Sequence, residues 1–249
     1  SRVFASRLLF GHRGAPATGL SENSIASFAR ALADGATALE TDVHTTKDGL
    51  VVCAHDPTLR TSTSTSSSTA RARIVDHTHA DLLAMRSERE RDHGTLPLLR
   101  DVLDRFRDVP VNLDIKQAEP RMERAVVDVI GADAERCLLA SFHPTALDRV
   151  RALGYRGPTG LGKNEIARIV AAPSFVARLW KPKGARAQVP KQSGRFRFDT
   201  RAFVDACHAL GIAVDYWVIN DVDDARALLA LGADGIMSDA PGTVAAAFG

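Results

Sequence analysis

Leu39–Val43 (LETDV) is an apolar run interrupted by two carboxylates, and a similar run lies on each side of it. Leu8–Gly14 (LLFGHRG) precedes it and ends in a His-Arg pair between glycines. Val51–Asp56 (VVCAHD) follows it and ends in a His-Asp pair. Short apolar runs bounded by turn residues are typical of buried β-strands. Each predicted strand therefore ends in residues that can take part in chemistry.

Strand-like runs alternate with helical patterns along the chain, which predicts βαβ units and a parallel sheet. The first helix is expected at 24–33, with Ser21 or Asn23 as its N-cap and Gly35 as its stop. Eight such units in 249 residues close most naturally as an α/β fold of the (β/α)8 TIM-barrel type. A doubly wound open sheet is the alternative. Because no linker rich in Pro or Gly divides the chain, one domain over residues 1–249 is expected.

The alternation is interrupted at about residues 57–96, which predicts a small insertion after the second strand of the barrel. Lys47–Gly49 is a turn, so residues 50–54 are expected to form a hairpin with that strand. Residues 61–69 consist of Ser and Thr, and this low-complexity composition is typical of an irregular segment. The sequence predicts no regular structure there.

Composition excludes several classes of protein. The net charge is only +2, and the basic and acidic residues are interleaved, so a nucleic-acid partner is not expected. The 3 cysteines are scattered in apolar runs, which predicts buried thiols and no disulfide framework. No run reaches about 18 consecutive apolar residues, so stable membrane insertion is not expected. The N-terminus lacks the apolar core of a signal peptide, which favours a cytoplasmic location, although a trimmed N-terminus after export would read the same. The oligomeric state stays open.

Glu40 and Asp42 are two residues apart in a predicted strand, so both side chains point to the same face. Two carboxylates on one face repel each other, and desolvation makes the repulsion worse. A divalent cation between them is a common solution, and oxygen ligands suit Mg²⁺ or Ca²⁺ better than Zn²⁺. Asp114 and Lys116 have the same spacing in a later strand. The alternatives are a solvated strand edge for the first pair and a plain salt bridge for the second.

The predicted barrel brings the C-terminal ends of its strands to one mouth, where active sites of this fold lie. The polar or aromatic residues expected there are His12, Arg13, Glu40, Asp42, Asp114, Lys116, Ser141, His143, Gln188, Trp217, Asn220 and Asp239. Two histidines, carboxylates and basic residues are what metal-assisted chemistry on phosphate esters requires. Each histidine taken alone also fits a structural role, His143 fits a simple helix start, and Trp217 fits core packing.

These residues resemble the signature of the glycerophosphodiester phosphodiesterase family. The resemblance rests on His12–Gly14, Glu22–Ser24, Glu40–Val43, Lys47–Gly49 and His55-Asp56. It extends through three later segments, which are Leu113–Lys116, Tyr216–Asn220 and Gly232–Asp239. This sequence departs from the family pattern at two places. The family often has Glu at the position of Asp114, and it often has glycines in the segment that is Ser/Thr-rich here.

The resemblance implies a TIM barrel, one divalent cation and hydrolysis of glycerophosphodiesters to glycerol 3-phosphate and an alcohol. In the implied mechanism the free glycerol hydroxyl of the substrate attacks phosphorus and expels the alcohol, and water then opens the cyclic phosphate. The resemblance implies that His12 and His55 are catalytic, with His12 preferred as the base. It implies that Glu40, Asp42 and Asp114 are ligands of Mg²⁺ or Ca²⁺. The residues that it implies for phosphate or substrate binding are Arg13, Lys116, Gln188 and Trp217.

Three other functions remain to be weighed. A lysophospholipase D or phospholipase C type enzyme would need an apolar mouth, and the Ser/Thr-rich segment offers little affinity for lipid. A non-catalytic phosphate-binding barrel would need Arg13 and Lys116 but not both histidines. A barrel aldolase or isomerase would use a Schiff-base lysine, and carboxylates beside Lys116 would keep that amine protonated.

Overall fold

A computed structural model of the chain describes residues 4, 7–60, 71–87, 91, 93–143, 145–171 and 180–249. The Ser/Thr-rich stretch at 61–69 lies outside the described residues. So does 172–179, which belongs to the helical region expected between Glu165 and Trp180.

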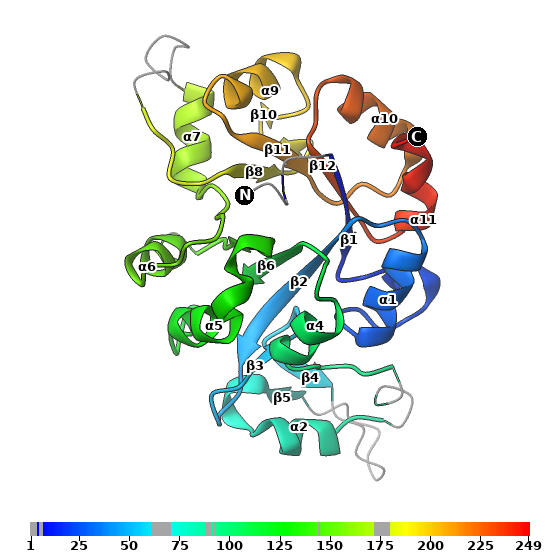
Figure 1. Ribbon diagram of the computed structural model, residues 1–249, viewed down its shortest axis with the longest axis vertical. Coiled ribbons are helices and arrows are strands. Elements are labelled where there is room, and N and C mark those ends of the chain that lie inside the picture. Colours follow the sequence, from blue (N-terminus) through cyan, green and yellow to red (C-terminus); the bar gives the residue numbers. More distant parts are fainter. Residues whose placement is uncertain are drawn as a thin grey trace.

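Seven parallel strands of the described chain curl into one sheet in the order β7-β6-β2-β1-β12-β11-β8 (Figure 1). They are β1 (Leu8–His12), β2 (Ala38–Thr45), β6 (Val111–Ile115), β7 (Cys137–Ala140), β8 (Arg186–Val189), β11 (Ala213–Tyr216) and β12 (Gly235–Ser238). Between the two ends of this order, Thr159 pairs with Leu139 of β7, and Gly160 pairs with Arg186 of β8. The fifth position, expected to be a strand at 157–160, is thus filled by two bridging residues. The predicted (β/α)8 barrel is confirmed.

Helices cover the outside of the strands (Figure 1). They are α1 (Ile25–Ala33), α4 (Leu99–Arg105), α5 (Glu123–Ile130), α6 (Ala146–Ala152), α7 (Lys163–Ala171), α9 (Arg201–His208), α10 (Val222–Ala230) and α11 (Pro241–Val244), with 3₁₀ turns η2 (Pro16–Thr18), η4 (Gly131–Arg136) and η5 (Ala245–Ala247). The N-cap of α1 is Ser24, whose hydroxyl accepts from the Ser27 amide, and not Ser21 or Asn23. Asn23 has φ +50° and directs its side chain toward β2.

Alternation along the strands separates an outer core from an inner one. Leu9 of β1 packs outward with residues of the α9 and α10 side, whereas Phe10 packs inward with Ala38 of β2 and Met237 of β12. This period of two is the ordinary geometry of a strand. The same alternation carries polar residues of β2 and β6 into the barrel, where they form the site described below.

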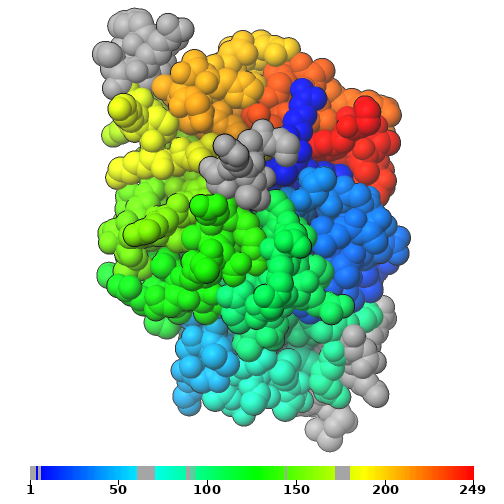
Figure 2. Space-filling model, in the orientation of Figure 1, coloured from blue at the N-terminus to red at the C-terminus, as the bar shows by residue number. Residues whose placement is uncertain are grey.

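The predicted insertion after the second strand is confirmed and contains regular structure of its own. β3 (Val51–Cys53) pairs antiparallel with β2. The insertion continues with the hairpin β4 (Thr58–Arg60) and β5 (Arg71–Arg73), the turn η3 (Ile74–Asp76) and α2 (His79–Ala84). The sequence analysis did not predict α2, because the alternation of strands and helices is interrupted there. Thr78 and Asp81 nevertheless form a capping box at the start of this helix. Figure 2 shows this region as the lower end of the molecule.

The three cysteines are buried thiols, as their apolar surroundings in the sequence predict. Cys53, Cys137 and Cys207 are free and buried, and burial raises the pKa of each thiol to about 12. Among the described helices, none has the length and hydropathy needed to cross a membrane.

A buried ion pair lies inside the barrel beneath the site. Arg186 and Asp215, on the neighbouring strands β8 and β11, are 2% and 0% exposed. Arg186 Nε donates to Asp215 Oδ2 at 2.7 Å, and its Nη1 donates to the Phe4 carbonyl at 2.9 Å. A Cβ at position 235 would lie 2.2 Å from Asp215 Oδ1, so only glycine leaves room for this carboxylate.

We expect Arg186→Met to lower the free energy of unfolding by about 3–5 kcal/mol, because it leaves the buried Asp215 charge without its cationic partner. Urea denaturation followed by circular dichroism measures the loss. The double variant Arg186→Met/Asp215→Leu removes both charges and should recover much of it. A single variant as stable as the unsubstituted protein would show that the pair is not needed.

Candidate active site

The residues predicted for the site come together in one cavity of about 310 Å³ at the C-terminal ends of the strands. Its walls include His12, Arg13, Glu40, Asp42, His55, Asp114, Lys116, Gln188 and Trp217, which are all the residues to which the sequence analysis gave a role. They come from β1, β2, β6 and β8 and from the residues that follow β1, β3, β6 and β11. The predicted convergence at one mouth is therefore what the fold produces.

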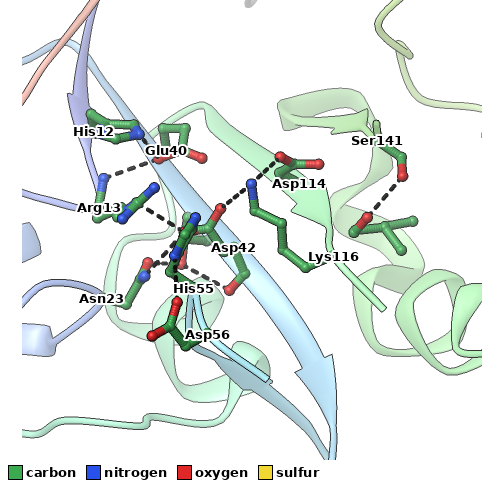
Figure 3. Close-up of polar contacts among 12 residues, drawn as sticks. His12, Arg13, Asn23, Glu40, Asp42, His55, Asp56, Asp114, Lys116 and Ser141 are labelled. Atoms are coloured by element: carbon green, nitrogen blue, oxygen red, sulfur yellow. Dashed lines mark hydrogen bonds and ion pairs between the residues drawn. The ribbon is translucent and has the colours of Figure 1, made fainter. Parts of the chain in front are cut away.

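Three carboxylates line the cavity and lie near one another (Figure 3). Glu40 and Asp42 project from β2, and the register of β2 against β6 places Asp114 directly beside Asp42. Glu40, Asp42 and Asp114 are 4%, 1% and 6% exposed to solvent, respectively. Burial of like charges at this density costs free energy unless cations or protons compensate for them.

Two basic side chains supply part of this compensation. Lys116 Nζ lies 3.0 Å from Asp42 Oδ1 and 2.7 Å from Asp114 Oδ2, so it bridges the two carboxylates (Figure 3). Arg13 Nε lies 3.1 Å from Asp42 Oδ2, and the Arg13 amide donates to Glu40 Oε2 at 3.0 Å. Desolvation lowers the pKa of Lys116, but Asp114 and Asp42 outweigh it and hold the pKa above its usual range. A Schiff-base role for Lys116 is correspondingly disfavoured.

Within the described residues, the permanently cationic side chains that pair with these three carboxylates are Arg13 and Lys116. Burial, followed by the charge of Asp42, raises the pKa of Glu40 to about 8. Burial also raises the pKa of Asp114, and Lys116 offsets part of that rise. Burial therefore disfavours the charged forms of both Glu40 and Asp114.

The carboxylate oxygens of Glu40, Asp42 and Asp114 are ligand atoms of the type that a hard divalent cation prefers. Asp114 Oδ1 is buried and makes no hydrogen bond, and carboxylate oxygens are the preferred ligands of Mg²⁺ and Ca²⁺. Within the described part of the chain, however, no three His, Cys, Asp or Glu side chains are arranged as a complete metal site. Lys116 lies between two of the predicted ligands. Metal binding by Glu40, Asp42 and Asp114 stays a prediction.

His12 is oriented by a carboxylate from the far end of the chain. Its Nδ1 lies 2.7 Å from Asp239 Oδ1, and Asn220 Nδ2 donates to Asp239 Oδ2 at 3.0 Å. Because a carboxylate only accepts, Nδ1 carries the proton and Nε2 faces the cavity. Nε2 lies 3.8 Å from Glu40 Oε2. Desolvation lowers the pKa of His12, but Glu40 and the Asp239 hydrogen bond outweigh it and raise the pKa above its usual value.

His55, which also lines the cavity, has a similar arrangement. Its Nδ1 lies 3.0 Å from Asp56 Oδ1, and Arg71 Nη2 lies 3.1 Å from Asp56 Oδ2. The side chain of His55 is 35% exposed, so its second nitrogen is accessible to a molecule in the cavity. Both predicted catalytic histidines are thus held through Nδ1 by an aspartate.

The remaining predicted residues shape the cavity. Gln188 Nε2 donates to Asn112 Oδ1 at 3.0 Å across the barrel. The Trp217 ring packs edge-on against Phe142 at 5.8 Å between centroids, on the cavity wall. His143 Nε2 lies 2.7 Å from the Lys116 carbonyl, and His143 is not among the residues that line the cavity.

The chain matches the model of the Glycerophosphoryl diester phosphodiesterase family over residues 12–243. It belongs to this family. The match begins at His12 and includes every predicted site residue, so the family and the site coincide along the sequence.

Named relatives of the family cover most of the chain. Probable glycerophosphodiester phosphodiesterase 2 of Mycobacterium tuberculosis is 30% identical over 241 residues, covering 94% of this chain and 87% of that protein. Human lysophospholipase D GDPD1 is 27% identical over 269 residues, covering 92% and 82%. The enzyme class predicted from the sequence, a phosphoric diester hydrolase of this family, is confirmed.

Solved structures of the family share the fold. A glycerophosphodiester phosphodiesterase from Thermotoga maritima has a TM-score of 0.73 at 24% identity, covering 95% of this chain and 96% of that chain. An Oleispira antarctica phosphodiesterase, solved in complex with the product sn-glycerol-3-phosphate, has a TM-score of 0.76 at 22% identity, covering 99% and 98%.

Sequence reasoning missed the residues that hold the site together. It placed Asp239 and Asn220 at strand ends but gave them no role. Asn23 stood inside the family motif, yet its contacts were not foreseen: its Nδ2 donates to Asp42 Oδ2 at 3.2 Å, and its Oδ1 accepts from Thr41 Oγ1 at 2.6 Å. A polar residue at the end of the last strand was the available signal for Asp239.

Asp239→Asn should lower the pKa of His12, because it removes both the negative charge and the carboxylate hydrogen bond that raise it. An NMR titration of the His12 ring measures the change. Asp234→Asn is the matched control, since Asp234 pairs with His208 at 2.7 Å and precedes β12 at the other end of the barrel. An unchanged pKa of His12 in Asp239→Asn would contradict the positioning role.

Proposed function

We propose that this chain hydrolyses glycerophosphodiesters to glycerol 3-phosphate and an alcohol, with His12 and His55 moving the protons and one Mg²⁺ or Ca²⁺ as cofactor. The observation that carries the proposal is the pair of aspartate-oriented imidazoles in one cavity with basic residues and buried carboxylates. The named relatives and the glycerol 3-phosphate in the Oleispira antarctica structure support the choice of substrate.

Arg13 and Lys116 are placed to bind the phosphoryl oxygens. Both side chains line the cavity, and both already lie against Asp42, which fixes their position before a substrate enters. Such preorganised cations stabilise negative charge that develops on phosphorus in the transition state. Gln188 and Trp217 bound the remaining space and would orient the glycerol or alcohol part of the substrate.

Glu40, Asp42 and Asp114 would hold the divalent cation. When bound, a divalent cation lowers the pKa of a nearby hydroxyl and neutralises charge on phosphoryl oxygens. Neutralisation of Glu40 would also remove the largest contribution that raises the pKa of His12. A lower pKa would leave more of His12 in the unprotonated form that can accept a proton near neutral pH.

His12 acts as the base and His55 as the acid in this proposal. His12 Nε2 faces the carboxylate cluster, where the phosphorus would lie, and accepts the proton of the attacking glycerol hydroxyl. His55 lies at the more exposed wall and donates a proton to the departing alcohol. When water opens the cyclic phosphate, the two proton transfers run in the opposite sense.

The test is hydrolysis of glycerophosphocholine, measured as release of glycerol 3-phosphate in the presence of Mg²⁺ or Ca²⁺. His12→Ala and His55→Ala should each lower turnover by at least about a hundredfold, a typical share for general acid-base catalysis. The matched control is His208→Ala, which breaks another His-Asp pair of 2.7 Å remote from the cavity and should leave turnover unchanged.

Retained turnover in either variant would remove that histidine from the mechanism. If the unsubstituted protein releases no glycerol 3-phosphate but still binds phosphate, the non-catalytic phosphate-binding barrel becomes the better explanation.

A further inference from the structure

A second hollow adjoins the catalytic cavity at His55, which lines both. Its volume is about 370 Å³, which is within the usual range for small-molecule sites. The segment that follows β3 forms one part of its wall, and the hairpin of β4 and β5 in the insertion forms another (Figure 1). We call it the hairpin hollow. Asp56 also lines it, and in Figure 3 Asp56 lies on the side of His55 away from Glu40.

Two groups of the proposed catalytic site lie at the boundary between the cavity and the hairpin hollow. Arg13 Nε lies 3.1 Å from Asp42 Oδ2 in the cavity. Its Nη1 lies 3.0 Å from Oε2 of Glu22, which lines the hollow. His55 lines both spaces. Because the departing alcohol takes its proton from His55 in the proposed function, this alcohol lies at the entrance of the hollow.

Two arginines of the hollow face each other across the hairpin. The register of β4 against β5 pairs Arg60 with Arg71, and both line the hollow. Like charges directly opposite each other on antiparallel strands are destabilising. Asp56 offsets one of these charges, because its Oδ2 lies 3.1 Å from Arg71 Nη2. Arg60 forms no ion pair within the described part of the chain. An anion between the two arginines would remove their repulsion.

The lining of the hollow carries an excess of positive charge. Arg86 is its third arginine. Its two carboxylates are those of Glu22 and Asp56, and each of them already pairs with an arginine. A guanidinium group binds a phosphate through two parallel N–H donors, so arginines that face each other suit a phosphate group. The hollow therefore favours a polar ligand that carries negative charge.

The arginine pair lies close to the histidine that would act as the acid. Asp56 Oδ1 lies 3.0 Å from His55 Nδ1, and Asp56 Oδ2 lies 3.1 Å from Arg71 Nη2. One carboxylate group thus separates the arginine from the imidazole. An alcohol the size of a sugar ring can span this separation, with its ester oxygen at His55 and a second phosphate at the arginines.

We propose that the hairpin hollow binds the alcohol half of the substrate and selects an alcohol that carries a phosphate monoester, held between Arg60 and Arg71. The inference rests on the proposed function, because this alcohol is the leaving group of the same reaction. The glycerol hydroxyl oxygen bonds to phosphorus and gives its proton to His12, while the bond from phosphorus to the alcohol oxygen breaks. That oxygen takes the proton of His55, and the phosphorylated alcohol leaves.

This site was not foreseen from the sequence. Arg60 and Arg71 lie on either side of the Ser/Thr-rich stretch, which hid their relation. They become neighbours only because the two short strands pair.

The test compares kcat/KM for glycerophosphoinositol with that for glycerophosphoinositol 4-phosphate, both measured as release of glycerol 3-phosphate at low ionic strength. The two substrates differ by one phosphate monoester. The unsubstituted protein should prefer the phosphorylated substrate by at least about tenfold, the usual effect of a hydrogen bond between charged groups. The preference should decrease as salt is added.

Arg60→Gln should lower the ratio of the two kcat/KM values by at least about tenfold. Arg73→Gln is the matched control, because Arg73 is exposed on the same hairpin but does not line the hollow. It makes the same change of charge and should leave the preference intact. Arg60 is exposed, and its substitution removes a like-charge pair, so folding is not threatened.

Equal kcat/KM values for the two substrates in the unsubstituted protein would overturn the inference and leave the proposed function standing. A preference that Arg60→Gln retains would also overturn it. So would a preference that Arg73→Gln loses to the same extent, because it would then come from the general charge of the surface.

A binding measurement separates the two proposals if neither substrate is hydrolysed. Inositol 4-phosphate and inorganic phosphate are each titrated into the protein and followed by calorimetry. Saturable binding of inositol 4-phosphate that Arg60→Gln weakens by at least about tenfold, and Arg73→Gln does not, would support the hollow while the proposed function fails. No saturable binding would overturn the assignment. Equally tight binding of inorganic phosphate would also overturn it, because the site would then hold a free anion and not an alcohol.

Discussion

Burial of three carboxylates on two neighbouring strands is the constraint on which the site depends. Glu40 and Asp42 point into the barrel because they alternate with Leu39 and Thr41, and the register of β2 against β6 adds Asp114. Lys116 and Arg13 lie against these groups because unpaired buried charges would cost several kcal/mol. The cations that make the cluster tolerable are also the groups that a phosphate requires. Stability of the cluster and recognition of the substrate therefore have the same physical origin.

Much of the site could be predicted because it follows from short-range geometry. A period of two puts Glu40 and Asp42 on one face, and a parallel barrel brings all strand ends to one mouth. The N-cap of α1 was predicted wrongly, because Asn is a residue type that often caps helices. The side chain of Asn23 instead forms hydrogen bonds with Asp42 and Thr41. The role of Asp239 was missed because it pairs with a residue 227 positions away.

Other features could not be read from local patterns at all. The fifth barrel position depends on two residues that bridge β7 and β8, too few to leave a strand pattern.

The most direct test concerns the proposed binding of a divalent cation by the carboxylate cluster. Calorimetric titration of the metal-free protein with Mg²⁺ or Ca²⁺ should show one divalent ion per chain. Glu40→Gln and Asp114→Asn should each weaken it by at least about tenfold. Asp224→Asn, a control at a surface carboxylate paired with Lys191, should not. Chelator should abolish release of glycerol 3-phosphate, and added metal should restore it. Full activity in chelator, or metal binding that survives both cluster substitutions, would contradict the assignment of this cluster as the cation site.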